Sequence, residues 1–115
     1  MAATLDRAIE ASEIVDALKP FGISQLDVAA VTRVSDRAVR GWRTNDIRAD
    51  RYDQLAQLRD LVLLLSDSLT PRGVGQWLHA MNRLLSGQRP IDLLAQDRYD
   101  EVRGAAEAFV DGSYV

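Results

Sequence analysis

The chain has 115 residues, of which 47% are hydrophobic and 27% charged, and its formal net charge is −3. This size suits one domain, or two small regions that share a core, and the composition is that of a folded protein. The absence of cysteine excludes disulfides, thiolate zinc sites and a cysteine nucleophile, and it fits a reducing cytoplasm. The longest run of strong hydrophobes, residues 61–65, is far shorter than the roughly 20 residues of a membrane span. We therefore expect a cytoplasmic protein with no membrane partner, and one whose overall charge is untypical of a nucleic-acid binder.

Helix-forming residues dominate the composition. Leucine and alanine supply 15 residues each, whereas valine, isoleucine and threonine together supply 19. This balance predicts an all-α fold, and the hydrophobic periodicity divides the chain into a compact bundle of about six to eight helices.

The first helix is expected to run from Thr4 to about Leu18, with Ile9 and Val15 on its apolar stripe. Pro20 and the following glycine end it, because proline cannot continue the hydrogen-bond ladder. Two short helices follow, over residues 25–31 and from Ser35 to about residue 43, separated by a three-residue break. Ser24 caps the first of them, with an acidic residue at its third position, and Ser35 caps the second.

A longer helix is expected over residues 50–67, and its surface is apolar on most sides. Because one small core does not need so much apolar surface, the pattern indicates a homo-oligomer. Thr70 and Pro71 restart the chain as a helix that carries Trp77. A short helix over residues 91–94 and a last helix over residues 98–110 complete the bundle, and Gly112 ends it.

The stretch from Val28 to Trp42 resembles the helix-turn-helix of Xre-type repressors. Residues 28, 29, 34, 39 and 42 would face inward, and the family usually has glycine where this chain has Arg33. Residues 33–51 hold six arginines and three aspartates, a local charge of +3. The candidates for low-affinity contact with operator DNA are Arg33, Asp36, Arg37, Arg40 and Arg43. The alternative is that these arginines pair with nearby aspartates on a solvated face.

A second motif lies in the C-terminal third. The string from Trp77 to Leu94 contains Trp-Leu, then a tight turn from Asn82 to Gly87, then Pro-Ile-Asp-Leu-Leu. This order and spacing resemble the Xre/MbcA/ParS toxin-binding domain, and the size of the chain is similar to that of MbcA-type antitoxins. The resemblance implies an Xre-like helix-turn-helix region over residues 1–68 and a helical toxin-binding region over residues 69–115, sharing one core.

The resemblance also implies a function. Such proteins are antitoxins of type II toxin-antitoxin systems, and their partners are RES-domain toxins that degrade NAD. The C-terminal region of the antitoxin blocks the NAD-binding cleft, and the antitoxin can autoregulate its operon. Carried over by position, the toxin-binding candidates are Trp77, Asn82, Arg83, Phe109, Gly112, Ser113, Tyr114 and Val115. An aromatic tail with a free carboxylate suits a nucleotide pocket.

Two alternatives remain open. The chain could be an Xre-like transcriptional repressor whose C-terminal half serves for dimerisation, or an adaptor for polar localisation of the ParS kind.

The residues give no sign of an enzyme. His79 is the sole histidine, with no serine or aspartate at helical spacing to orient it. The carboxylates at positions 97, 100 and 101 fit a solvated helix start, and Gly73 and Gly75 lack the rest of a phosphate-binding loop and instead weaken their helix or pack closely. We expect no catalytic residue, no metal, no cofactor and no small-molecule substrate.

Overall fold

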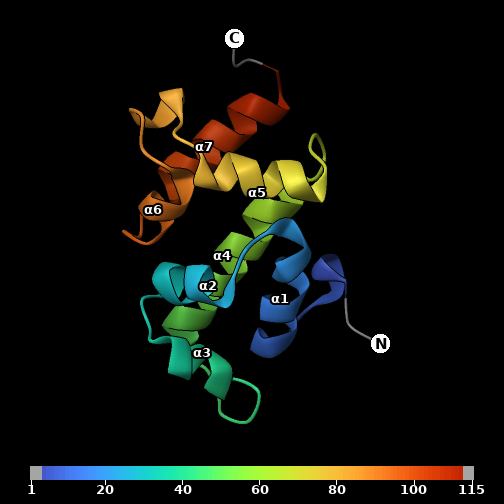
Figure 1. The fold of residues 1–115 in the computed structure, drawn as a ribbon, viewed down its shortest axis with the longest axis vertical. Helices are drawn as coiled ribbons and strands as arrows, with labels where there is room; N and C mark the ends of the chain where they lie inside the picture. Colours follow the sequence, from blue (N-terminus) through green and yellow to red (C-terminus); the bar gives the residue numbers. More distant parts are fainter. Residues whose placement is uncertain (1–3, 113–115) are drawn as a thin grey trace.

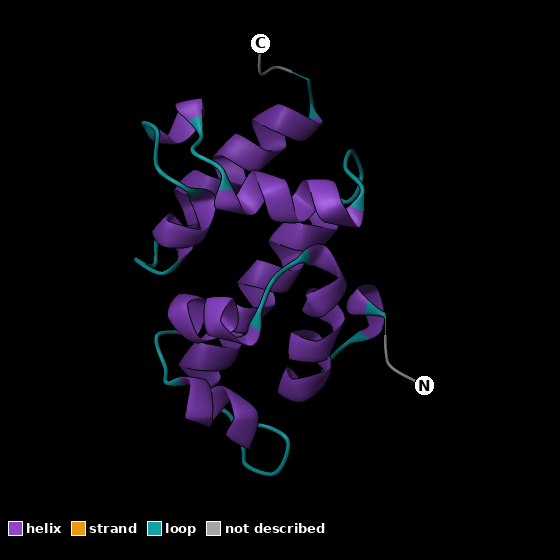
Figure 2. Cartoon of the chain, in the orientation of Figure 1, coloured by secondary structure: helices purple, strands orange, loops and turns teal. Residues whose placement is uncertain are grey.

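The computed structural model describes residues 4–112, and this part of the chain is helical with no β-strand (Figure 2). The α-helices are α1 (Ala11–Leu18), α2 (Gln25–Thr32), α3 (Asp36–Gly41), α4 (Ala49–Leu65), α5 (Pro71–His79), α6 (Pro90–Leu94) and α7 (Tyr99–Val110). Three 3-10 turns join them: η1 (Leu5–Arg7), η2 (Lys19–Phe21) and η3 (Arg83–Leu85). The predicted all-α class and the range of six to eight helices are confirmed. Within the described range, no helix is both long and apolar enough to cross a membrane.

The helix starts are set by local capping, as the sequence predicts. The hydroxyl of Ser24 accepts from the backbone N–H of Asp27 at 3.0 Å, and the Asp27 carboxylate accepts from the Ser24 N–H at 2.9 Å. Ser35 and Thr70 each accept a backbone N–H three residues ahead at 3.1 Å, and Pro71 is the first residue of α5. Each cap satisfies an N–H that has no partner within the helix.

The predicted first helix is wrong in its start. The chain forms η1, runs extended through residues 8–10, and only then enters α1. Glu10 and Glu13 make a capping box, in which the Glu13 carboxylate accepts from the Glu10 N–H at 3.1 Å. Ile9 therefore lies on a corner and is 69% exposed, instead of belonging to the apolar stripe.

Helix α4 is the central element, and α1, α2 and α7 pack on it (Figure 1). Leu55, Leu58, Leu61, Val62 and Leu65 have no exposed surface, or almost none. The large hydrophobic side chains that are exposed within residues 4–112 lie on other elements: Ile9, Leu26, Met81 and Leu84. Most of the apolar surface of α4 is thus covered within one chain, although Leu63 and Leu64 are only half-buried, and self-association stays a prediction.

Helix α5 crosses η2 at a very short distance. A Cβ atom built on Gly75 would lie 2.3 Å from the carbonyl oxygen of Phe21, so only glycine fits there without a shift of the backbone. The sequence raised close packing as one role of this glycine, and the structure confirms it. Side chains from both predicted regions, such as Leu18 and Leu78, meet in one hydrophobic core, while the division at residues 68/69 stays a prediction.

Helices α2 and α3 are joined by a turn at Arg33. This residue has φ 57° and ψ 43°, the left-handed conformation that favours glycine. Val28, Ala29 and Val39 are buried, and Trp42 is half-buried against the core. The predicted inward face of this pair of helices is therefore correct.

Candidate functional site

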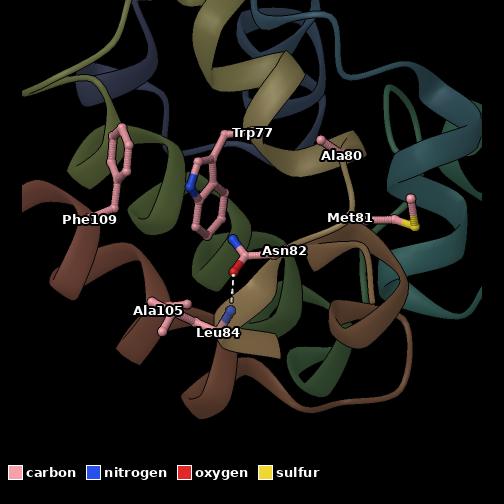
Figure 3. A pocket seen from close by; sticks show the side chains of 7 residues that line it. All are labelled: Trp77, Ala80, Met81, Asn82, Leu84, Ala105 and Phe109. Carbon is pink, nitrogen blue, oxygen red and sulfur yellow. Dashed lines mark hydrogen bonds between the residues drawn. The ribbon is translucent and has the colours of Figure 1, made fainter. Parts of the chain in front are cut away.

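An apolar hollow lies between the end of α5 and the last helix. It has a volume of about 140 Å³ and is lined by Trp77, Ala80, Met81, Asn82, Leu84, Ala105 and Phe109 (Figure 3). One water occupies about 30 Å³ of liquid, so the hollow has room for one large apolar side chain. We call this site the Trp77 hollow.

Two aromatic side chains form one wall of the Trp77 hollow. The ring centroids of Trp77 on α5 and Phe109 on α7 are 6.5 Å apart, and the ring planes are inclined at 53°. This tilted geometry is one that aromatic pairs prefer. Both rings are half-buried, so each is held by the core on one side and presents its other side to the hollow.

The floor of the hollow depends on a turn that Asn82 organises. Its side-chain oxygen accepts from the Leu84 N–H at 2.9 Å, and its backbone carbonyl accepts from the Gly87 N–H at 2.9 Å. Ser86 and Gly87 both have positive φ, which reverses the chain. The turn leaves Met81 81% exposed and Leu84 49% exposed at the rim.

The helix that carries Trp77 ends at His79, because the chain becomes extended at Ala80 and re-forms a turn only at Arg83. The predicted turn from Asn82 to Gly87 is present.

The structure brings together three of the predicted toxin-binding residues: Trp77, Asn82 and Phe109 all line the hollow. Arg83 is exposed on η3 but is not part of the lining, and Gly112 follows α7 with φ 72°. The remaining candidates, Ser113, Tyr114 and Val115, lie outside the described residues.

The sequence reasoning missed the rim residues Met81 and Leu84. Both belong to the motif string, and the signal that could have found them is their position: Met81 directly precedes the predicted turn and Leu84 lies within it, where a large apolar side chain has few ways to reach the core.

Most of the predicted DNA-contacting residues are engaged in ion pairs. Arg40 lies 3.3 Å from Asp36, within α3. Arg43 lies 2.7 Å from Asp16 on α1, and this hydrogen bond is the main cause that lowers the pKa of Asp16. Arg33 lies 3.9 Å from Asp97.

Arg37 differs from these residues. It is exposed on α3 and lines a groove between α3 and the start of α4.

His79 is oriented by a partner far away in the sequence. Its Nδ1 lies 2.8 Å from the carbonyl oxygen of Gly75, and its Nε2 lies 3.1 Å from the Asp27 carboxylate on α2. Both partners are acceptors, so the charged ring donates to both and the neutral ring to one. The contact ties α5 to α2, which is a structural role.

Beside it, Arg89 and Asp92 form a bidentate pair at 2.8 Å, and their hydrogen bonds lower the pKa of Asp92 and raise the pKa of Arg89. Among residues 4–112 there is no cluster of three metal-ligating side chains.

Comparisons with known proteins give relatives of one kind. The chain is 82% identical, over the full length of both sequences, to a probable mycobacterial cidal antitoxin of Mycobacterium tuberculosis. It is 25% identical over 107 residues to the mycobacterial cidal antitoxin MbcA of Mycobacterium tuberculosis and of Mycobacterium bovis, which covers 91% of this chain and 95% of MbcA. No family model matches.

Among solved structures, the fold is similar to a chain in the crystal structure of the M. tuberculosis MbcT–MbcA toxin-antitoxin complex. The TM-score is 0.77 at 24% sequence identity, and the match covers 94% of this chain and 99% of that one. At 24% identity, this similarity shows that the two chains share a fold.

Proposed function

The chain belongs to the MbcA-like family of mycobacterial cidal antitoxins, and we propose that it binds and neutralises a RES-domain toxin that degrades NAD. In this proposal the Trp77 hollow receives an apolar side chain of the toxin, and the C-terminal region that begins at α7 blocks the NAD-binding cleft. The antitoxin acts by binding and has no catalytic residue of its own.

The observation that carries the proposal is the convergence of the motif residues on one surface. Trp77, Asn82 and Phe109 come from three separate segments and line the same hollow, with Met81 and Leu84 exposed at its rim. Apolar and aromatic side chains around a pocket are typical of the energetic centre of a protein interface. Phe109 near the end of α7 lines this surface, so a bound toxin would lie close to the end of α7.

Substitutions at the rim of the Trp77 hollow test whether this surface binds the toxin. Met81→Asp combined with Leu84→Asp places two charges at the hollow without disturbing the core, because Met81 is 81% exposed and Leu84 49% exposed. Loss of an interface centre costs about 2 kcal/mol or more, so binding to a co-expressed RES-domain toxin should weaken at least about 30-fold. The readout is NAD consumption by the purified toxin at increasing antitoxin concentration.

The matched control is Leu26→Asp, which changes a leucine that is 68% exposed on α2 and is not part of the lining of the hollow. This variant should protect NAD as the unchanged chain does. Full protection by the Met81/Leu84 variant would refute the assignment of the hollow. Full protection by a chain that lacks residues 113–115 would refute blockade of the cleft by the tail while leaving the hollow in place.

Autoregulation by operator binding is the second candidate function. It is favoured by Arg37, which α3 presents to solvent, and by the local charge of +3 over residues 33–51. Arg37→Ala together with Arg40→Ala should weaken binding to the promoter of its own operon and reduce the dependence of binding on salt. Salt-insensitive or absent promoter binding by the protein and its toxin complex would refute this role.

A further inference from the structure

We propose that Met81 is a site of reversible oxidation, and that its conversion to methionine sulfoxide by a peroxide weakens toxin binding at the Trp77 hollow. The inference rests on the proposed function, because it requires that the rim of the hollow contacts the toxin. To that function it adds a chemical modification that controls the contact, with a peroxide as the class of substrate and Met81 as the residue modified.

The Met81 side chain is open to a dissolved oxidant. It is 81% exposed, although methionine is among the residue types that are most often buried. Figure 3 shows its sulfur at the edge of the hollow, turned away from the ring of Trp77. The second methionine of the chain is Met1, which lies outside the described residues, and the chain has no cysteine. A peroxide that reaches the chain therefore meets no thiol that would react ahead of Met81.

The backbone on both sides of Met81 is held in place. The N–H of Ala80 donates to the carbonyl of Gln76 at 3.0 Å, and the N–H of Asn82 donates to the carbonyl of Gln88 at 3.1 Å. Because Met81 joins the end of α5 to the turn that Asn82 organises, the chain has little freedom to withdraw this side chain into the core. The thioether thus stays at the rim and in solvent.

Met81 marks a boundary between an apolar and a polar surface. It lines the Trp77 hollow, and it also belongs to the lining of a neighbouring groove that continues along the turn and α6. The other side chains of that groove are mostly polar: Gln88, Arg89, Asp92 and Gln96. A partner that covers the hollow therefore meets Met81 at its edge, and a polar group at this position makes the apolar surface smaller.

The reaction is a two-electron oxidation at sulfur. The lone pair on Sδ attacks one oxygen of hydrogen peroxide, and the O–O bond breaks as the S–O bond forms. The proton on the transferred oxygen passes to the leaving hydroxide, so the second product is water. A methionine sulfoxide reductase reverses the step: a dithiol supplies two electrons and becomes a disulfide, and the oxygen leaves as water.

Oxidation weakens binding because the sulfoxide is polar. Burial of a methionine side chain changes an equilibrium constant by roughly 10- to 100-fold, and a buried sulfoxide oxygen has to give up its water. The oxidised chain should therefore bind the toxin about 10- to 100-fold more weakly. In the complex the toxin covers the same side chain, so Met81 should be oxidised more slowly in bound antitoxin than in free antitoxin.

The test treats the full chain with hydrogen peroxide, removes the peroxide, and titrates the chain against the purified RES-domain toxin, with NAD consumption as the readout. Peptide mass spectrometry confirms that Met81 has gained one oxygen atom. We expect protection of NAD to require about 10- to 100-fold more oxidised chain than untreated chain. A methionine sulfoxide reductase with dithiothreitol should restore it.

The matched control is Met81→Leu, which conserves side-chain volume, keeps Met1 and Trp77, and has no sulfur at position 81. It is compared with its own untreated sample, and treatment should change nothing. Equal losses in treated Met81→Leu and in the treated unchanged chain would assign the effect to another residue and overturn the inference. Equal rates of Met81 oxidation in the free chain and in the complex would overturn it as well.

The remaining outcomes separate the inference from the proposed function. Full protection by the oxidised chain, together with impaired protection by the Met81/Leu84 variant, would refute control by oxidation and leave the proposed function in place. Failure of the untreated chain to protect NAD would refute the proposed function and this inference with it.

Discussion

The crossing of α5 over η2 gives a prediction whose size follows from the structure. In Gly75→Ala, the added Cβ would lie 2.3 Å from the Phe21 carbonyl oxygen and 3.3 Å from its carbon, whereas real Cβ contacts are essentially never below 3.0 Å. The obstacle is backbone, so the helix must move. Overpacking of this kind costs about 3 kcal/mol, and the better helix propensity of alanine returns about 1 kcal/mol, which leaves a net loss of about 2 kcal/mol.

Thermal unfolding followed by circular dichroism measures the effect. For 115 residues the unfolding entropy is about 0.24 kcal/mol per kelvin, so the midpoint should fall by about 8 °C. The matched control is Gly104→Ala in α7, where a Cβ meets no atom within 4 Å. There the propensity gain of about 1 kcal/mol stands alone, and the midpoint should rise by about 4 °C. If Gly75→Ala melts at or above the unchanged chain, the reasoning from this contact is refuted.

Three further predictions concern polar contacts. Asn82→Ala removes the side-chain acceptor of the turn and should lower the free energy of unfolding by about 1 kcal/mol, with a larger loss of toxin binding measured by calorimetry. His79→Ala removes the contact with Asp27 and should cost about 1–2 kcal/mol in urea unfolding; no change would show that the contact is not stabilising. Because the hydrogen bond from Arg43 holds the pKa of Asp16 below 3.8, this pair stabilises the fold above about pH 4, and its small contribution is lost as the pH falls through the lowered pKa; Asp16→Asn should remove that part of the acid dependence.

Features that depend on neighbours in the sequence were predicted well. The caps at Ser24, Ser35 and Thr70 work because each hydroxyl reaches an N–H three residues ahead, a distance fixed by the helix itself. The turn at Asn82 is equally local. Arg33 stands where Xre-type repressors usually have glycine, and it adopts the left-handed conformation that favours glycine.

Features that depend on the arrangement of helices were not visible in the sequence. The capping box at Glu10 starts a new helix, which excludes one continuous helix from Thr4 to Leu18. Hydrophobic periodicity cannot distinguish these two outcomes, so it predicted an inward position for Ile9, which is exposed. Asp27 and His79 are 52 positions apart, so no spacing rule connects them. At the candidate site, the sequence predicted three of the residues that line the hollow. It did not predict Met81 and Leu84, because their exposure depends on how the turn at Asn82 packs against α7.

The single hydrophobic core has a consequence for the lifetime of the protein. Buried side chains from Leu5 to Ala106 belong to one cluster, so the two ends of the chain are expected to unfold together. A ligand that binds the folded chain a hundred times above its dissociation constant adds about 2.7 kcal/mol to the free energy of unfolding. Because the core is shared, this stabilisation extends to η1 as well as to α7. A protease that cleaves only the unfolded chain would find about one hundredth as much unfolded chain as without the ligand.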